Sequence, residues 1–257
     1  MKMSLDSCVR LASALHGAWL RRHLALLLAL ITLGGSLLKA TQPLAESYFS
    51  NRRNVLNVYF VKFSWGWTMG LLLPFIFISN YFVQMDVLFA VRRITSCVVG
   101  TAVWFISTRT FLIVENFTGE CYESQNMTVL HKFENRYACR KQGHLWLGFD
   151  ISGHSFLLSY CVLMITEEIA VMNELHRVEQ KPGKATATII KSLFIALNAL
   201  LLLWVWMFLC TAVYFHDMPH KIIGTAFGIS AWYGTYRFWY KKPFSPGLPL
   251  EIGNKNE

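Results

Sequence analysis

Six segments of this chain run for at least 15 residues without a charged side chain, and this pattern constrains the fold more than any other feature. A transmembrane helix needs about 20 mostly apolar residues to cross a hydrocarbon core of about 30 Å. Composition agrees, because 54% of the residues are apolar and only 15% are charged, against about a quarter in soluble domains. The sequence therefore predicts an all-α polytopic membrane protein with six transmembrane helices, at about residues 23–38, 60–82, 94–114, 151–172, 187–215 and 221–239.

Four of the six uncharged segments are short for a full crossing, namely 24–38, 94–108, 151–166 and 222–236. Flanking basic residues such as Arg21 and Arg237 must then reach back to the interface, or the membrane must be thin. The endoplasmic reticulum bilayer is a few Å thinner than average, so short spans favour that compartment. A re-entrant segment is the alternative for one of the six.

Basic residues give the orientation of the chain. The 24 Lys and Arg outnumber the 15 Asp and Glu, but they are scattered rather than gathered with aromatic residues on one face, so we expect no nucleic-acid partner. If the N-terminus is cytosolic, 14 basic residues lie on the cytosolic side and 9 on the other, with Arg109 inside the third span as the last of the 24. This bias predicts cytosolic termini at residues 1–22 and 240–257.

The predicted lumenal loop 115–150 carries two glycosylation sequons and two cysteines. The sequons begin at Asn116 and Asn126, and Asn126 is the expected glycan site because it lies farther from the third span. A lumenal position also permits a disulfide between Cys121 and Cys139. The other four cysteines have no metal-ligand spacing, so we interpret them as packing residues.

Residues 149–158, FDISGHSFLL, place a Ser-Gly-His triplet where a polar loop becomes an apolar helix. The start of a helix offers unpaired N–H groups and the positive end of a dipole, which favour a bound anion such as phosphate. Ser152 is a good N-cap, Gly153 lets a ligand approach the backbone, and His154 can transfer a proton near neutral pH. A capped helix whose histidine simply lies at the interface is the alternative.

A second histidine pair, His216 and His220, lies where the fifth span ends. Because the fourth and fifth spans are consecutive, the start of one and the end of the other face the same compartment. His154 and His216 would then divide the roles of general acid and nucleophile. A haem or metal site held by two histidines is the rival interpretation, although no third ligand is visible at a fixed spacing.

Three arginines are candidates for a phosphate clamp. Arg52 and Arg53 lie beside aromatic residues in the loop before the second span, where an interfacial anchor is the alternative. Arg109 lies inside the third span, where it is either functional or reaches to the interface. Glu167 and Glu168 end the fourth helix about 20 Å from His154, so we expect a solvated helix end there.

Four long segments make residues 36–249 resemble the fat storage-inducing transmembrane protein family: ESYFSNRRNVLNVYFVK, GFDISGHSFLL, FLCTAVYFH and WYGTYRFWYKKPFSPGLP. The resemblance implies a six-span protein of the endoplasmic reticulum that binds triacylglycerol and diacylglycerol and supports lipid droplet formation and lipid metabolism. It also implies relation to the lipid phosphate phosphatases. The implied activity is a diphosphatase that splits fatty acyl-CoA into acyl 4′-phosphopantetheine and adenosine 3′,5′-bisphosphate.

The lipid phosphate phosphatase pattern carries over in part. Ser152, Gly153 and His154 match its Ser-Gly-His motif, whose histidine protonates the leaving group, and His216 matches its nucleophile. The motif that combines Lys with Arg-Pro is absent, so Arg52, Arg53 and Arg109 are only candidates for the clamp.

The partner that orients His216 stays open. In that superfamily an aspartate follows the nucleophile after three residues, and here His220 takes that place while Asp217 is adjacent to His216. Because no carboxylate cluster for magnesium is visible near either histidine, we expect neither a metal nor a cofactor. The prediction is a fatty acyl-CoA diphosphatase in contact with membrane lipids. A non-enzymatic protein that binds triacylglycerol or diacylglycerol is the alternative, and the sequence identifies no protein partner in the reticulum or cytoskeleton.

Overall fold

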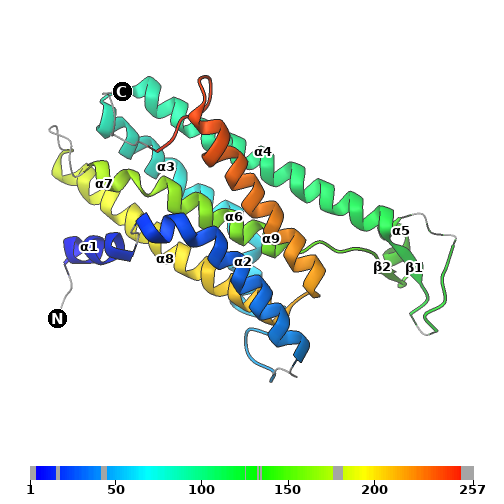
Figure 1. The fold of residues 1–257 in the computed structure, drawn as a ribbon. Coiled ribbons are helices and arrows are strands. Elements are labelled where there is room, and N and C mark those ends of the chain that lie inside the picture. The colour runs from blue at the N-terminus through cyan, green and yellow to red at the C-terminus, as the bar shows by residue number, and fades with distance from the viewer. Residues whose placement is uncertain are drawn as a thin grey trace.

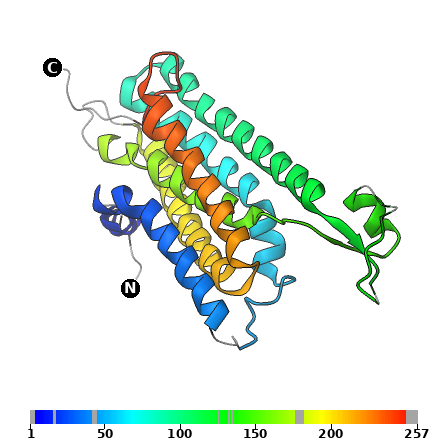
Figure 2. The same ribbon diagram turned by 45° about the vertical axis from the view of Figure 1, so that its right-hand side comes forward.

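The computed structural model describes residues 4–15, 18–41, 45–124, 126–131, 133, 135–175 and 182–249. Its long helices pack into one elongated bundle (Figures 1 and 2). They are α2 (Ala18–Thr41), α3 (Ser64–Gln84), α4 (Val87–Thr118), α6 (Gly153–Glu168), α8 (Lys184–Tyr214) and α9 (Met218–Trp232). The short helices are α1 (Leu5–Leu15), α5 (Arg136–Lys141) and α7 (Val171–Leu175). Parts of the predicted cytosolic ends, at residues 1–3 and 250–257, lie outside the described residues.

Helix α6 forms the centre of the bundle. From Ser155 to Glu168 every side chain except that of Leu157 is buried, and the helix packs against α9, α8, α3 and α2. A helix buried on all sides must be apolar around its whole circumference, which explains its uncharged sequence from Ile151 to Thr166. The surrounding helices fix α6 in place and so fix the Ser-Gly-His triplet at its start.

Two glycines bring α9 close to α6. A Cβ atom at Gly224 would collide with the backbone carbonyl of Ser152, and one at Gly228 would collide with the side chain of Ser159. Small residues allow this kind of close approach between membrane helices. The two contacts tie α9 to the first half of α6.

Five helical segments are long and apolar enough to cross a membrane: Trp19–Thr41, Leu56–Gln84, Val87–Thr118, Gly153–Leu175 and Lys184–Tyr214. The α-helical part of α9 has 15 residues and continues as a π-helical turn, Tyr233–Phe238, and a 3₁₀ turn, Trp239–Lys241. Fifteen residues at about 1.5 Å each are short of the hydrocarbon thickness. The structure therefore supports an all-α polytopic membrane protein, and a sixth crossing depends on the irregular continuation of α9.

A small module stands at the far end of α4, away from the other helices (Figure 1). It contains an antiparallel pair of strands, β1 (Glu120–Tyr122) and β2 (Leu145–Leu147), together with α5. The disulfide predicted between Cys121 and Cys139 is confirmed, and both cysteines are buried with Trp146 in a core of their own. The two sequons differ, because Asn126 lies in an exposed turn whereas Asn116 lies in the last turns of α4.

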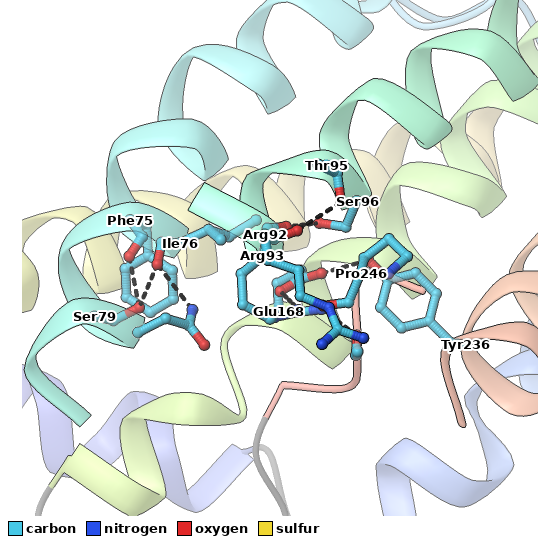
Figure 3. Close-up of polar contacts among 12 residues, drawn as sticks. Phe75, Ile76, Ser79, Arg92, Arg93, Thr95, Ser96, Glu168, Tyr236 and Pro246 are labelled. Carbon is cyan, nitrogen blue, oxygen red and sulfur yellow. Dashed lines mark hydrogen bonds and ion pairs between the residues drawn. The ribbon is translucent and has the colours of Figure 1, made fainter. Parts of the chain in front are cut away.

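At the opposite end of the bundle, the two glutamates that end α6 are buried, so the expectation of a solvated helix end was wrong. Glu168 is fully buried and binds Nη2 of the fully buried Arg93 at 2.6 Å, while Tyr236 donates its hydroxyl to the other oxygen at 2.6 Å (Figure 3). Glu167 pairs with Arg21 at 3.4 Å and Arg237 at 2.9 Å. The partners come from α4, α2 and the end of α9, which the local sequence around α6 does not reveal.

The same arginine also holds the C-terminal segment. Arg93 Nη1 donates to the carbonyls of Pro246 and Gly247, and Arg92 Nε donates to the carbonyl of Ser245 at 2.7 Å. One buried cation thereby joins α4, α6 and the segment after α9.

Candidate active site

A cavity of about 630 Å³ opens at the end of the bundle where α6 begins and α8 ends. Its lining combines two histidines, three cations, one carboxylate and several apolar or neutral residues: Arg52, Arg53, Asn57, Val61, Lys62, Thr108, Asp150, Gly153, His154, Leu157, Phe215 and His216. These residues belong to four separate parts of the chain. The structure thus brings together both predicted histidines and two of the three predicted arginines.

The start of α6 places His154 at the cavity wall. Ser152 is the N-cap, and its Oγ accepts a hydrogen bond from the backbone N–H of Ser155 at 3.2 Å. The Ser152 side chain is fully buried, so it caps the helix and does not line the cavity, whereas Gly153 and His154 do. Ser152 therefore does not touch a ligand in the cavity, and its role is to hold the start of α6 in place.

His216 lies in the short turn between α8 and α9. Its φ of +46° is uncommon for a residue other than glycine, and its carbonyl accepts a hydrogen bond from Lys39 Nζ at 2.6 Å. The backbone N–H of Ser152 donates to the carbonyl of His220 at 3.1 Å. These bonds fasten the His216 turn to the end of α2 and to the start of α6, so the two catalytic candidates are held by one framework.

The electrostatic surroundings of His216 are mostly positive. Burial lowers the pKa of His216, and the neighbouring Arg52, His220 and Lys39 lower it further. Asp150 acts in the opposite direction, because its Oδ2 lies 3.8 Å from Nδ1 of His216. The result favours a neutral imidazole, which is the nucleophilic form.

The basic lining differs from the prediction at two positions. Arg109 does not line the cavity; it is exposed, and its guanidinium lies 5.2 Å from the centroid of the Phe105 ring. Thr108, one residue earlier, faces the cavity instead. Lys62 was missed by the sequence analysis, although it ends the same basic and aromatic segment that contains Arg52.

The loop that carries the arginines is held by its own polar residues. Asn57 is buried and its Nδ2 donates to the carbonyl of Arg52 at 2.8 Å, while Asn51 Oδ1 accepts from the backbone N–H of Arg53 at 2.8 Å. Asn57 belongs to a π-helical turn, Leu56–Phe60, and Lys62 lies in the 3₁₀ turn Val61–Phe63 that follows it. The cations are thus presented from an ordered segment at the cavity rim.

The two residues considered as orienting partners of His216 have other principal contacts, although the ring of His220 also stands edge-on to the ring of His216, with centroids 6.4 Å apart. The Asp217 side chain is 80% exposed and pairs with Lys39 at 3.5 Å. The ring of His220 packs edge-on against Phe149, with centroids 4.6 Å apart. Asp150 occupies the place next to His216 that the sequence analysis left open.

Comparison with known proteins decides the family. The profile of the family described as "FIT: Fat storage-inducing transmembrane protein" matches residues 45–236, about three quarters of the chain. The chain belongs to this family. The match includes every residue that lines the cavity. Family membership and the five long apolar helices together make it a multi-pass membrane protein.

Curated relatives of the fat storage-inducing transmembrane protein family cover most of the chain. Acyl-coenzyme A diphosphatase FITM2 of Xenopus tropicalis is 54% identical over 229 residues, which are 89% of this chain and 86% of the relative. The Homo sapiens protein of the same name is 50% identical over 247 residues, 96% and 93% of the two chains. Fat storage-inducing transmembrane protein 1 of Mus musculus is 37% identical over 240 residues, 93% and 80%. No solved structure matches the chain.

The arrangement suits chemistry on a phosphate ester or anhydride. Two histidines on separate elements can act as nucleophile and general acid, and three basic side chains can neutralise phosphate oxygens. Among the described residues, no three His, Cys, Asp or Glu side chains are grouped in a way that would hold a metal ion. The groups that the cavity offers for such chemistry are the two imidazoles, the three cations and the start of α6.

Proposed function

We propose that the protein is a fatty acyl-CoA diphosphatase that cleaves the phosphoanhydride of acyl-CoA to acyl 4′-phosphopantetheine and adenosine 3′,5′-bisphosphate. The observation that carries the proposal is the cavity that places His154 and His216 among three cations at the end of the helix bundle. The names of the FITM2 relatives support the same activity. Acyl-CoA is therefore the proposed partner of the cavity.

In this mechanism, a ring nitrogen of His216 attacks one phosphorus of the anhydride. A P–N bond forms, the P–O bond to the bridging oxygen breaks, and His154 donates a proton to the departing phosphate. Water then attacks the phosphohistidine, the P–N bond breaks, and His154 takes up the proton of that water. Each half of acyl-CoA leaves with one phosphate, as the two products require.

The cations supply most of the transition-state stabilisation. Charge on the equatorial phosphate oxygens is neutralised in phosphoryl transfer mainly by positive groups fixed in place beforehand. Arg52, Arg53 and Lys62 line the cavity for this purpose, and the N–H groups at the start of α6 add a second positive region. Arg109 has no part in this clamp.

The position of the disulfide supports an orientation of the bundle in the membrane. The disulfide module and the cavity lie at the end where α4 finishes and α6 begins, and a disulfide persists in an oxidising compartment. We therefore place this end at the lumenal face of the endoplasmic reticulum, with one integral membrane domain, six crossings and both termini cytosolic. The acyl chain stays in the membrane while the nucleotide occupies the polar cavity. We also propose a role in lipid droplet formation and lipid homeostasis, which rests on membership of the fat storage-inducing transmembrane protein family.

A second candidate function has one observation in its favour. A smaller cavity of about 280 Å³ lies between α2 and α9, lined by mostly apolar residues: Ala29, Thr32, Leu33, Ile222, Thr225, Ala226, Ile229 and Ser230. Its lining suits an acyl chain of triacylglycerol or diacylglycerol. A non-enzymatic neutral-lipid binding protein would use this site and would leave the two histidines without a reaction.

Purified protein incubated with oleoyl-CoA distinguishes the two functions. The proposal expects adenosine 3′,5′-bisphosphate and oleoyl 4′-phosphopantetheine in equal amounts by mass spectrometry, and strong loss of both products in His154→Ala. The matched control is His144→Ala, which alters a histidine that does not line the cavity. Binding of diacylglycerol or triacylglycerol without any cleavage of oleoyl-CoA would refute the enzymatic proposal.

A further inference from the structure

The carboxylate of Asp150 faces the imidazole of His216 across the cavity wall, with 3.8 Å between Oδ2 and Nδ1. We propose that Asp150 is the positioning residue of the nucleophile: it holds the Nδ1–H of His216, which leaves Nε2 free to attack phosphorus. This inference rests on the proposed function, because it assigns a role within that reaction. The distance is longer than a hydrogen bond, as is common before substrate closes a site.

The backbone around Asp150 is fixed to the same framework as His216. Asp150 is two residues before Ser152, whose backbone N–H donates to the carbonyl of His220, four residues after His216. The neighbouring Ile151 is buried in the main core. Asp150 and His216 therefore belong to two segments that are hydrogen-bonded to each other, so the fold sets the separation of their backbones.

The other acidic residue near His216 in the sequence has a different partner. Asp217 is mostly exposed and pairs with Lys39 at 3.5 Å, and the same Lys39 Nζ binds the carbonyl of His216. Lys39 thus holds the backbone of the turn, and the exposed Asp217 carboxylate contacts Lys39 instead of the ring of His216. This contrast makes Asp217 a matched control for Asp150, since both are aspartates close to the nucleophile.

The negative charge of Asp150 distinguishes it from the other described groups that face His216. The groups that face His216 are Arg52, Lys39, His220 and, across the cavity, His154, all of which are positive or become positive on protonation. Of these groups in the described part of the chain, only Asp150 is an anion. It raises the pKa of His216, whereas burial and the cationic groups lower it.

The attack creates a cationic ring, and Asp150 is placed to stabilise it. When Nε2 forms the P–N bond, positive charge spreads over the imidazole and Nδ1–H becomes a stronger donor to the carboxylate. An aspartate in this position selects the tautomer and stabilises the imidazolium without itself accepting the proton. His154 still supplies the proton for the leaving phosphate, so the proton balance of the reaction is unchanged.

Kinetics of three variants test the role. We expect Asp150→Asn to lower kcat by about 10- to 100-fold, as when a carboxylate partner of a histidine ring is removed elsewhere, while KM stays equal or falls because a negative charge leaves the phosphate site. Asp150→Glu should restore part of kcat, and Asp217→Asn should behave as wild type. Equal kcat in Asp150→Asn and wild type would overturn the inference while leaving the diphosphatase proposal intact.

A second measurement does not depend on activity. Diethyl pyrocarbonate modifies neutral imidazole, so its rate at the peptide containing His216, followed by mass spectrometry across pH, reports the pKa of that ring. Removal of Asp150 should move this titration to lower pH, and Asp217→Asn should leave it unchanged. An unchanged titration in Asp150→Asn would overturn the inference even if the protein proved to have no diphosphatase activity.

Discussion

Replacing Glu168 by Gln tests the buried ion pair at the end of the bundle opposite the cavity. Glu168 and Arg93 are both fully buried, 2.6 Å apart, and the substitution keeps the size of the side chain while leaving the Arg93 cation without its counterion. Removing one partner of a buried pair costs about 3–5 kcal/mol, because the remaining charge is buried and uncompensated. The Tyr236 hydroxyl would also lose its charged acceptor.

The double variant separates the pair from its surroundings. In Arg93→Met with Glu168→Met neither charge of this pair remains, so the loss should be much smaller than the sum of the two single losses. It should not reach zero, because the carbonyls of Pro246 and Gly247 lose their donor, at about 1 kcal/mol each.

Thermal unfolding of the detergent-solubilised protein measures these changes. For a chain of this size about 1 kcal/mol shifts Tm by about 2–4 °C, so Glu168→Gln should lower Tm by about 6–20 °C. The control is Asp6→Asn, which breaks the exposed pair with Lys191 and should change stability by less than about 1 kcal/mol. Equal Tm values for Glu168→Gln and Asp6→Asn, or a double variant that loses the full sum, would refute the reasoning.

Three further outcomes are expected. Non-reduced peptides should show Cys121 joined to Cys139, and Cys121→Ser should make the module more sensitive to protease, since the cross-link is worth about 3 kcal/mol in the chain-entropy model; free thiols would contradict this. Asn126→Gln should abolish the endoglycosidase shift and Asn116→Gln should not; a shift that depends only on Asn116 would contradict the assigned turn. Activity should survive EDTA and follow a bell-shaped pH profile. Burial and cationic neighbours lower the pKa of His216, so the neutral nucleophile persists below the usual histidine pKa of about 6.5, and the acidic limb of the profile should lie below that pH. Loss of activity in EDTA that a divalent cation restores would contradict the metal-independent mechanism.

The sequence predicted the helices well because charge spacing is a local property. Uncharged runs located all five long apolar segments, and the two cysteines of the polar loop predicted its disulfide, whereas β1, α5 and β2 were not predicted. The uncharged runs did not predict that α6 is the central helix. The run in α8 is even longer, yet α8 is one of the helices that surround α6. Likewise Glu168 meets Arg93 across 75 positions of sequence, and no local pattern connects them.

The site shows the same division between local and distant information. His154 and His216 could be brought together because consecutive spans share a membrane face. Whether Thr108 or Arg109 lines the cavity depends on the rotation of α4 about its axis, because neighbouring residues of a helix point about 100° apart. The sequence did not give this rotation, since the helices that α4 packs against were unknown. Lys62 follows a π-helical turn, which changes the face that later residues present. Asp150 could not be paired with His216 from the sequence, because the two residues lie in separate parts of the chain that only the fold brings together.

Detection of a phosphohistidine at His216 tests the central claim most directly. The protein would be mixed with oleoyl-CoA for a fraction of one turnover, quenched at alkaline pH where phosphohistidine persists, and digested for mass spectrometry. The account predicts a substrate-derived phosphate on the His216 peptide that decays as product forms, and its absence, together with loss of turnover, in His216→Ala. Continued cleavage of oleoyl-CoA by His216→Ala, with no modified histidine, would contradict it.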